Sequence, residues 1–199
     1  MALDYNSNCY IFDFDGTVID SNLLKRNALV DYGFSLGLTE IEVLEVLSHN
    51  KDRYETISLY HEKKGTSLDK TTYQKFDNEL FSILKNASYI DGAREFIRRL
   101  SYQGKSLYLV SLTPNEQLQR IVGELDLHKY FCQVRGTSNK CQTVKDILNI
   151  EGDALMIGDQ LSDYKIAESL SLSFLGVCSP GSSLTLGGNI VRSFKFLNF

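Results

Sequence analysis

The sequence lacks the features that mark secreted, zinc-knuckle and membrane proteins. Its four cysteines are scattered without a CxxC pair, so neither a zinc knuckle nor a disulfide framework is indicated. No apolar run is long enough to cross a bilayer, and residues 1–8 lack the basic start and apolar stretch of a secretory signal. We therefore expect a soluble cytoplasmic protein that has no membrane partner.

Proline and clustered basic residues are also scarce. Only two prolines are present, and no Pro/Ser-rich linker or internal repeat occurs, so a domain boundary has to be found from the pattern of strands and helices. The formal net charge of -4, without a basic block, argues against nucleic acid as a partner because counterion release needs clustered lysine and arginine. A small-molecule substrate is the better expectation, and nothing in the sequence indicates an oligomeric state.

Each of several short apolar segments ends in small or polar residues, as strands buried on both faces do. The segments are residues 9–12, 107–111, 154–159 and 173–177, and helical patterns cover residues 93–103, 115–125, 140–150 and 162–170. Strands that alternate with amphipathic helices indicate right-handed crossovers and a parallel sheet. The prediction is a doubly wound, Rossmann-like α/β core, whose ligands bind beyond the carboxyl ends of the strands.

Residues 21 to about 86 break this alternation, because they show helix after helix and no clear strand. Apolar residues recur there at helical spacing, as Ile41, Leu44 and Leu47 do. We expect a small all-helical cap at residues 21–87, inserted between two parts of the core at residues 1–20 and 88–199. A lid in that place excludes water and selects the substrate, while the core supplies the chemistry.

Two carboxylates, Asp13 and Asp15, follow the first predicted strand and can project toward the same side. Like charges so close repel one another unless a cation or a shared proton compensates, which indicates a metal or acid–base work. Gly16 and Thr17 follow in a turn whose backbone N–H groups can cradle an anion. For this stretch taken alone, a helix N-cap and an ordinary turn are the alternative interpretation.

Polar residues also follow the next core segments. Ser111 ends the second strand, where its hydroxyl can donate a hydrogen bond to a phosphoryl oxygen, whereas helix capping by Thr113 or Asn115 is the alternative for this neighbourhood. Lys140 opens a helix, a position from which an ammonium group can neutralise a phosphate and a nucleophilic carboxylate. Lys145, further along the same helix, is its rival.

A second acidic pair, Asp159 and Asp163, lies at the end of the 154–159 segment and in the turn that follows. Oxygen-rich acidic clusters of this kind suit Mg²⁺, a hard ion that keeps some waters and also touches the phosphate of a substrate. Asp13, Ser111 and Asp159 all fall at the carboxyl ends of predicted parallel strands. The sequence therefore predicts that they meet at one edge of the sheet.

In this order and spacing, the segments resemble the haloacid dehalogenase-like (HAD) superfamily of phosphohydrolases. The match comprises DFDGT at residues 13–17, the strand end at Ser111, Lys140, and GDxxxD at residues 158–163. The resemblance extends from Ile11 to about Val177, and the helical insertion resembles the C1-type cap of the superfamily. One position departs from the pattern, because many relatives follow the motif lysine with proline and Cys141 stands there in this chain.

The resemblance implies a role for each motif residue. Asp13 is expected to be the nucleophile, and Asp15 to protonate the leaving group and then activate water. The expected phosphoryl-binding groups are Ser111, Lys140 and the backbone N–H groups near Gly16, Thr17 and Leu112. The implied Mg²⁺ ligands are Asp13, the backbone carbonyl of Asp15, Asp159, and Asp163 directly or through water.

The expected activity is Mg²⁺-dependent hydrolysis of a small phosphorylated metabolite through an aspartyl-phosphate, and a sugar phosphate, phosphoglycolate or a nucleotide all fit. The nearer alternative is a phosphotransferase or mutase of the same superfamily. A non-catalytic receiver-like phosphate-binding module is more distant, because a receiver lacks the helical insertion. In the cap, Arg53 is the candidate for contacting the substrate, and a plain surface charge is the alternative.

Overall fold

The computed structural model of the chain describes residues 7–184, 190–195 and 197. The chain forms two compact units, one of Met1–Asn22 with Ala87–Phe199 and one of Leu23–Asn86. We call them the α/β unit and the helical unit. The chain passes between them after Asn22 and again after Asn86. That the helical unit acts as a cap stays a prediction.

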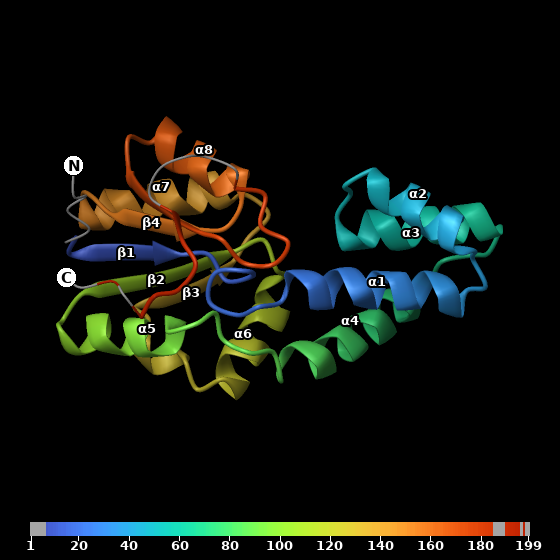
Figure 1. The fold of residues 1–199 in the computed structure, drawn as a ribbon, viewed down its shortest axis with the longest axis horizontal. Coiled ribbons are helices and arrows are strands. Elements are labelled where there is room, and N and C mark those ends of the chain that lie inside the picture. The colour runs from blue at the N-terminus through green and yellow to red at the C-terminus, as the bar shows by residue number, and fades with distance from the viewer. Residues whose placement is uncertain (1–6, 185–189, 196, 198–199) are drawn as a thin grey trace. The chain divides into compact units, whose positions relative to one another are not determined.

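The α/β unit contains a six-stranded sheet in the order β3-β2-β1-β4-β5-β6, and each neighbouring pair of strands is parallel (Figure 1). The strands are β1 (Cys9–Phe12), β2 (Ser106–Ser111), β3 (Gln133–Gly136), β4 (Leu155–Gly158), β5 (Ser173–Val177) and β6 (Ile190–Val191). The predicted α/β fold class is confirmed. Sequence reasoning missed β3 and β6, the two edge strands, because their residues are only half-buried and form no long apolar run.

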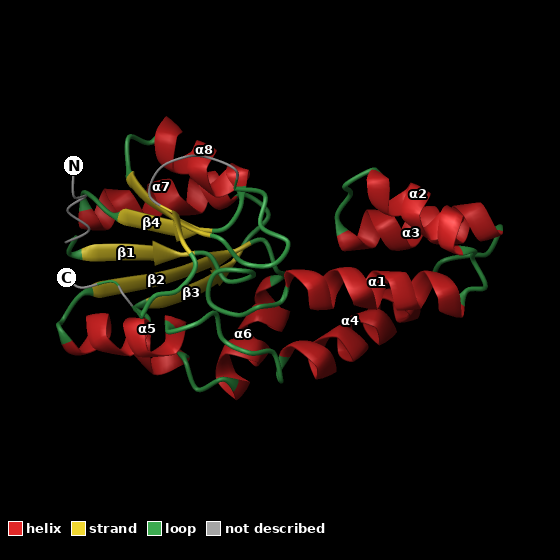
Figure 2. Cartoon of the chain, in the orientation of Figure 1, coloured by secondary structure: helices red, strands yellow, loops and turns green. Residues whose placement is uncertain are grey.

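Helices cover both faces of this sheet (Figure 2). They are α5 (Ala93–Tyr102), α6 (Asn115–Glu124), a 3₁₀ turn η1 (His128–Tyr130), α7 (Lys140–Glu151) and α8 (Leu161–Ser169). On one face, Cys9 and Ile11 of β1 pack against α7 and α8. On the other face, Tyr10 and Phe12 make edge-to-face contacts with Phe96 of α5. Since both faces are covered, every residue of β1 is apolar, and the strand positions its carboxyl end rigidly.

The order of the strands decides which residues meet. β1 lies between β2 and β4, with Phe12 opposite Leu109 on one side and Ile157 on the other. The N–H of Asp13 then donates to the carbonyl of Ile157 at 2.8 Å, which continues the pairing by one residue. The residues that follow β1, β2 and β4 are therefore brought to one edge of the sheet.

The helical unit has its own small core. Its helices are α1 (Asn22–Ser35, which starts at the last residue of the α/β unit), α2 (Glu40–Ser48), α3 (Arg53–Lys64) and α4 (Lys70–Leu84). Leu38, Val43, Val46 and Tyr60 form the buried cluster. The apolar spacing of Ile41 and Leu44 predicted a helix correctly, but both side chains are exposed and α2 buries Val43 and Val46 instead.

The ends of these helices are capped by local side chains. Asp52 accepts hydrogen bonds from the N–H groups of Tyr54 and Glu55 at the start of α3, and Asp69 accepts one from Thr72 at the start of α4.

Among the described residues of the chain, no helix combines the length and apolarity that a membrane span requires.

Candidate active site

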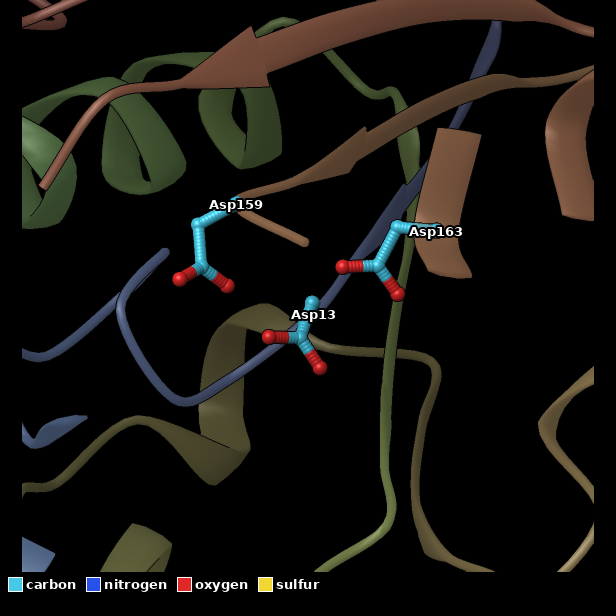
Figure 3. A group of neighbouring side chains, drawn as sticks. All are labelled: Asp13, Asp159 and Asp163. Atoms are coloured by element: carbon cyan, nitrogen blue, oxygen red, sulfur yellow. The ribbon is translucent and has the colours of Figure 1, made fainter. Parts of the chain in front are cut away.

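Three carboxylates converge at the carboxyl edge of the sheet. Asp13 follows β1, Asp159 follows β4, and Asp163 lies in the first turn of α8 (Figure 3). One oxygen atom from each lies within 4.8 Å of the other two, and all three residues are buried. Most of the chain separates Asp13 from Asp159 and Asp163 in the sequence. The strand order brings them together, because β1 lies beside β4 in the sheet.

The side chain of Lys140 joins two of these carboxylates. Its Nζ donates to Asp13 Oδ1 at 2.5 Å and to Asp163 Oδ1 at 2.7 Å, and the residue is buried. Burial by itself lowers the pKa of Lys140, but the two carboxylates outweigh burial and the net direction is upward, so the group stays charged. Lys145 is exposed on the same helix. The structure therefore places Lys140, not its rival, at the carboxylate cluster.

The cluster carries more negative charge than Lys140 can balance. Burial raises the pKa of Asp159 to about 6, and burial also raises the pKa of Asp13, although Lys140 acts in the opposite direction. The Oδ1 atom of Asp159 is buried and has no hydrogen-bond partner among the described residues. A buried carboxylate oxygen without a donor is costly, and a hard divalent cation is the group that satisfies it. The residues present thus fit Mg²⁺.

Asp163 differs from the other two carboxylates, because both of its oxygens are engaged. Oδ1 accepts from Lys140, and Oδ2 accepts from the backbone N–H of Gln160 at 3.1 Å, just before α8. The side chain thus holds the lysine and the start of α8. Its role as a metal ligand stays a prediction.

Asp15 turns toward the end of β2. Its Oδ2 accepts from Thr113 Oγ1 at 2.8 Å and more weakly from Ser111 Oγ at 3.4 Å, while Oδ1 accepts from Ser21 Oγ at 2.7 Å. Ser111 and Thr113 are buried. The N-cap of α6 is Pro114, which makes no side-chain capping hydrogen bond, and the Thr113 hydroxyl donates to Asp15. Asp15 is therefore a half-buried carboxylate that three hydroxyl groups hold in place.

The turn after Asp15 uses its amides internally. The N–H of Gly16 donates to the carbonyl of Ile19 at 2.8 Å, and that of Thr17 lies 3.4 Å from the carbonyl of Phe14. Each of these two amides thus has a carbonyl acceptor within the turn. Leu112 follows β2 with its side chain largely exposed. Anion binding at these backbone groups stays a prediction.

Arg53 lies in the helical unit, at the first position of α3. Its guanidinium pairs with Asp77 at 3.1 Å and donates to the hydroxyl of Tyr54 at 2.9 Å, and only 14% of its side chain is exposed. It is therefore not a plain surface charge. Its contact with a substrate stays a prediction.

Sequence reasoning missed the roles of four residues, two beside Asp15 and two beside Asp159. Ser21 and Thr113 hold Asp15, while Asn22 and Gln160 donate to Asp159 Oδ2 at 2.7 and 2.5 Å. Ser21 and Asn22 were expected to belong to the cap, whereas the structure assigns both to the α/β unit. Gln160 lies inside the GDxxxD motif, Ser21 and Asn22 lie a few residues after DFDGT, and Thr113 lies two residues after Ser111, so polar residues near the motifs were the available signal.

Residues 10–177 match the model of the haloacid dehalogenase-like hydrolases. The chain belongs to this family. The resemblance noted from the sequence is thereby confirmed, as is the expectation that the protein is an enzyme. No curated protein matches the HAD chain significantly.

Several solved structures share the fold of this HAD chain at low sequence identity. CbbY from Rhodobacter sphaeroides, in complex with xylulose-1,5-bisphosphate, is 14% identical with a TM-score of 0.73, and 94% of each chain is covered. A Bacillus subtilis protein described as a HAD-hydrolase and bound to magnesium is 17% identical with a TM-score of 0.72, again with 94% of each chain covered. A Clostridium difficile protein described as a phosphatase is 23% identical with a TM-score of 0.67, covering 89% of this chain and 88% of that one.

Proposed function

We propose that this HAD-family enzyme is a Mg²⁺-dependent phosphomonoester hydrolase of a small phosphorylated metabolite, and that Asp13 carries the phosphoryl group. The observation that supports the proposal most strongly is the buried set of Asp13, Lys140 and Asp159. In this set one lysine faces excess carboxylate charge, and one carboxylate oxygen has no donor among the residues that the structure describes. A divalent cation offsets the excess negative charge of such a set, and the lysine and the cation together can then receive a phosphoryl group.

In the first step, an oxygen of Asp13 attacks the phosphorus atom of the substrate. A bond forms between that oxygen and phosphorus, and the bond from phosphorus to the ester oxygen breaks. Lys140, already within hydrogen-bonding distance of Asp13, orients the carboxylate and neutralises the phosphoryl group, and the Ser111 hydroxyl donates to one of its oxygens. When bound, Mg²⁺ supplies charge neutralisation at Asp13 and Asp159.

Asp15 moves the protons in both steps. As a general acid it protonates the departing ester oxygen, and as a general base it then takes a proton from the water that attacks phosphorus and releases Asp13. Its hydrogen bonds from Ser21 and Thr113 fix the carboxylate beside the nucleophile's strand end. Two carboxylates with separate hydrogen-bond partners suit two separate roles.

The substrate class is a sugar phosphate or a similar small phosphomonoester. The structural likeness to CbbY in complex with xylulose-1,5-bisphosphate supports this class, and the magnesium-bound Bacillus protein of the same fold supports the cation. No described feature of the chain supports a macromolecular substrate.

A panel of phosphorylated metabolites tests the proposal. We expect release of inorganic phosphate from at least one member in the presence of Mg²⁺, and loss of that release in excess EDTA or in Asp13→Asn. Full turnover in EDTA would remove the cation from the mechanism. Appearance of a phosphorylated acceptor without free phosphate would instead identify a phosphotransferase or mutase.

A further inference from the structure

The Asp159 carboxylate is held on one side only. Its Oδ2 accepts from Asn22 Nδ2 at 2.7 Å and from Gln160 Nε2 at 2.5 Å, whereas its Oδ1 is buried and has no partner among the described residues. Two amide donors on one oxygen use the lone pairs of that atom. They leave Oδ1 as the oxygen that is available to a cation at the carboxylate cluster.

The amide of Gln160 is fixed in this orientation by its other contacts. The hydroxyl of Ser183 accepts from the N–H of Leu161 at 3.0 Å, so its proton is directed to Gln160 Oε1 at 2.7 Å. The oxygen of the amide is therefore occupied, and the NH₂ group faces Asp159. Ser182 Oγ also donates to the backbone carbonyl of Asp159 at 2.6 Å, which holds the main chain of the same residue.

Two glycines make room for Asn22. Gly16 has a φ of +72°, and a Cβ at this position would clash with both Asn22 Nδ2 and Asp159 Oδ2. Gly181 has a φ of +84°, and its Cβ would lie 2.9 Å from the Cβ of Asn22. Both positions favour glycine on conformation alone, and both also leave the space that the Asn22 side chain fills. Three separate segments, around Gly16, Asp159 and Gly181, thus surround the side chain of Asn22 where it contacts Asp159.

From this geometry we infer that Asn22 and Gln160 are positioning residues that make Asp159 a one-oxygen metal ligand and so favour Mg²⁺ over Ca²⁺. Mg²⁺ requires compact octahedral coordination, whereas Ca²⁺ accepts more oxygens and two-oxygen carboxylate ligands. Outer hydrogen bonds of this kind orient a metal ligand without touching the ion. The inference rests on the proposed Mg²⁺ site and goes beyond it by explaining its selectivity.

Asn22→Leu and Gln160→Met test the inference, because each removes the donor at similar side-chain length. Asn27→Ala is the matched control, since Asn27 is exposed on the same helix as Asn22. Titration calorimetry of the full chain with MgCl₂ and with CaCl₂ gives both affinities. We expect each donor variant to bind Mg²⁺ roughly 10- to 100-fold more weakly. Ca²⁺ affinity should fall less, because the freed carboxylate can offer both oxygens, and the control should match the wild type.

The outcomes separate the inference from the proposed function. Wild-type chain that binds no Mg²⁺ would overturn both, whereas tight wild-type binding with unchanged affinity in both donor variants would overturn only the positioning role. Equal losses for Mg²⁺ and Ca²⁺ would contradict the selectivity. Asn22→Ala removes the donor without added bulk, and urea unfolding without metal shows which variants are folded, so a misfolded leucine variant does not decide the result.

Discussion

The two units use the same residue type in opposite ways. In the helical unit Asp69 is exposed, and hydrogen bonds from the Thr72 and Thr71 side chains and backbone lower its pKa to about 2. In the α/β unit Asp159 is buried, and burial raises its pKa to about 6 in spite of two amide donors. An aspartate that caps a helix is satisfied by its own segment. An aspartate at the sheet edge depends on distant segments and, in our account, on a cation.

Removal of Lys140 should have the largest effect, because it leaves Asp13 and Asp163 buried without their shared partner. We expect Lys140→Ala to lower the free energy of unfolding by roughly 3–5 kcal/mol without metal and to abolish turnover. Lys145→Ala, at an exposed position of the same helix, should stay within about 0.5 kcal/mol of the wild type. Urea unfolding measures both. Similar small losses in the two variants would show that the buried pair matters no more than a surface charge.

Asp15 is intermediate between these two aspartates, because hydroxyl groups donate to both of its oxygens, as in a helix cap, yet it lies beside the buried cluster. If its role is chemical, Asp15→Asn keeps the fold and slows turnover by about 10²- to 10⁴-fold, since the amide cannot exchange the proton. The control is Asp153→Asn, an exposed residue before β4. Steady-state rates on the best substrate decide, and wild-type turnover in Asp15→Asn would assign this carboxylate a purely structural role.

Asp69 should give the smallest effect, which is confined to acidic pH. Its pKa in the folded chain is about 2, below the ordinary value of 3.8, so the ionised side chain stabilises the folded state above about pH 4. That contribution is lost as pH falls toward 2. Asp69→Asn keeps an acceptor for Thr72 but does not titrate. We therefore expect the variant to lose less thermal stability than the wild type between pH 5 and pH 3, as followed by circular dichroism. Parallel losses would show that Asp69 contributes nothing to this pH range.

Much of the α/β unit is predictable because its strands are buried on both faces. A segment such as residues 9–12 is apolar throughout, and the polar residue after it marks the strand end. The edge strand β3 cannot be predicted in this way, because it pairs with β2 alone in the described sheet and its residues are only half-buried. In α2 the helical period is visible in the sequence, but the buried face is decided by which neighbour packs against it, and this favoured Val43 over Ile41.

The candidate site divides in a similar way. Motif spacing identified Asp13, Asp159 and Lys140, whose convergence follows from the strand order. The hydrogen-bond partners of these side chains could not be predicted from the motifs. The hydrogen bond from Asn22 to Asp159, for example, joins residues that are 137 positions apart in the chain. Local sequence carries no signal for such a contact. Only the fold shows that Asn22, at the start of α1, donates to the carboxylate that follows β4.

Trapping the covalent intermediate on Asp13 shows whether this carboxylate carries the phosphoryl group. The enzyme is mixed with Mg²⁺ and its best substrate, quenched in acid and reduced with borohydride, which converts an aspartyl-phosphate to homoserine. We predict that peptide mass spectrometry finds this conversion at position 13 in the wild type and nowhere in Asp13→Asn. Steady turnover with an unmodified Asp13, or conversion at another carboxylate, would contradict the nucleophilic role of Asp13.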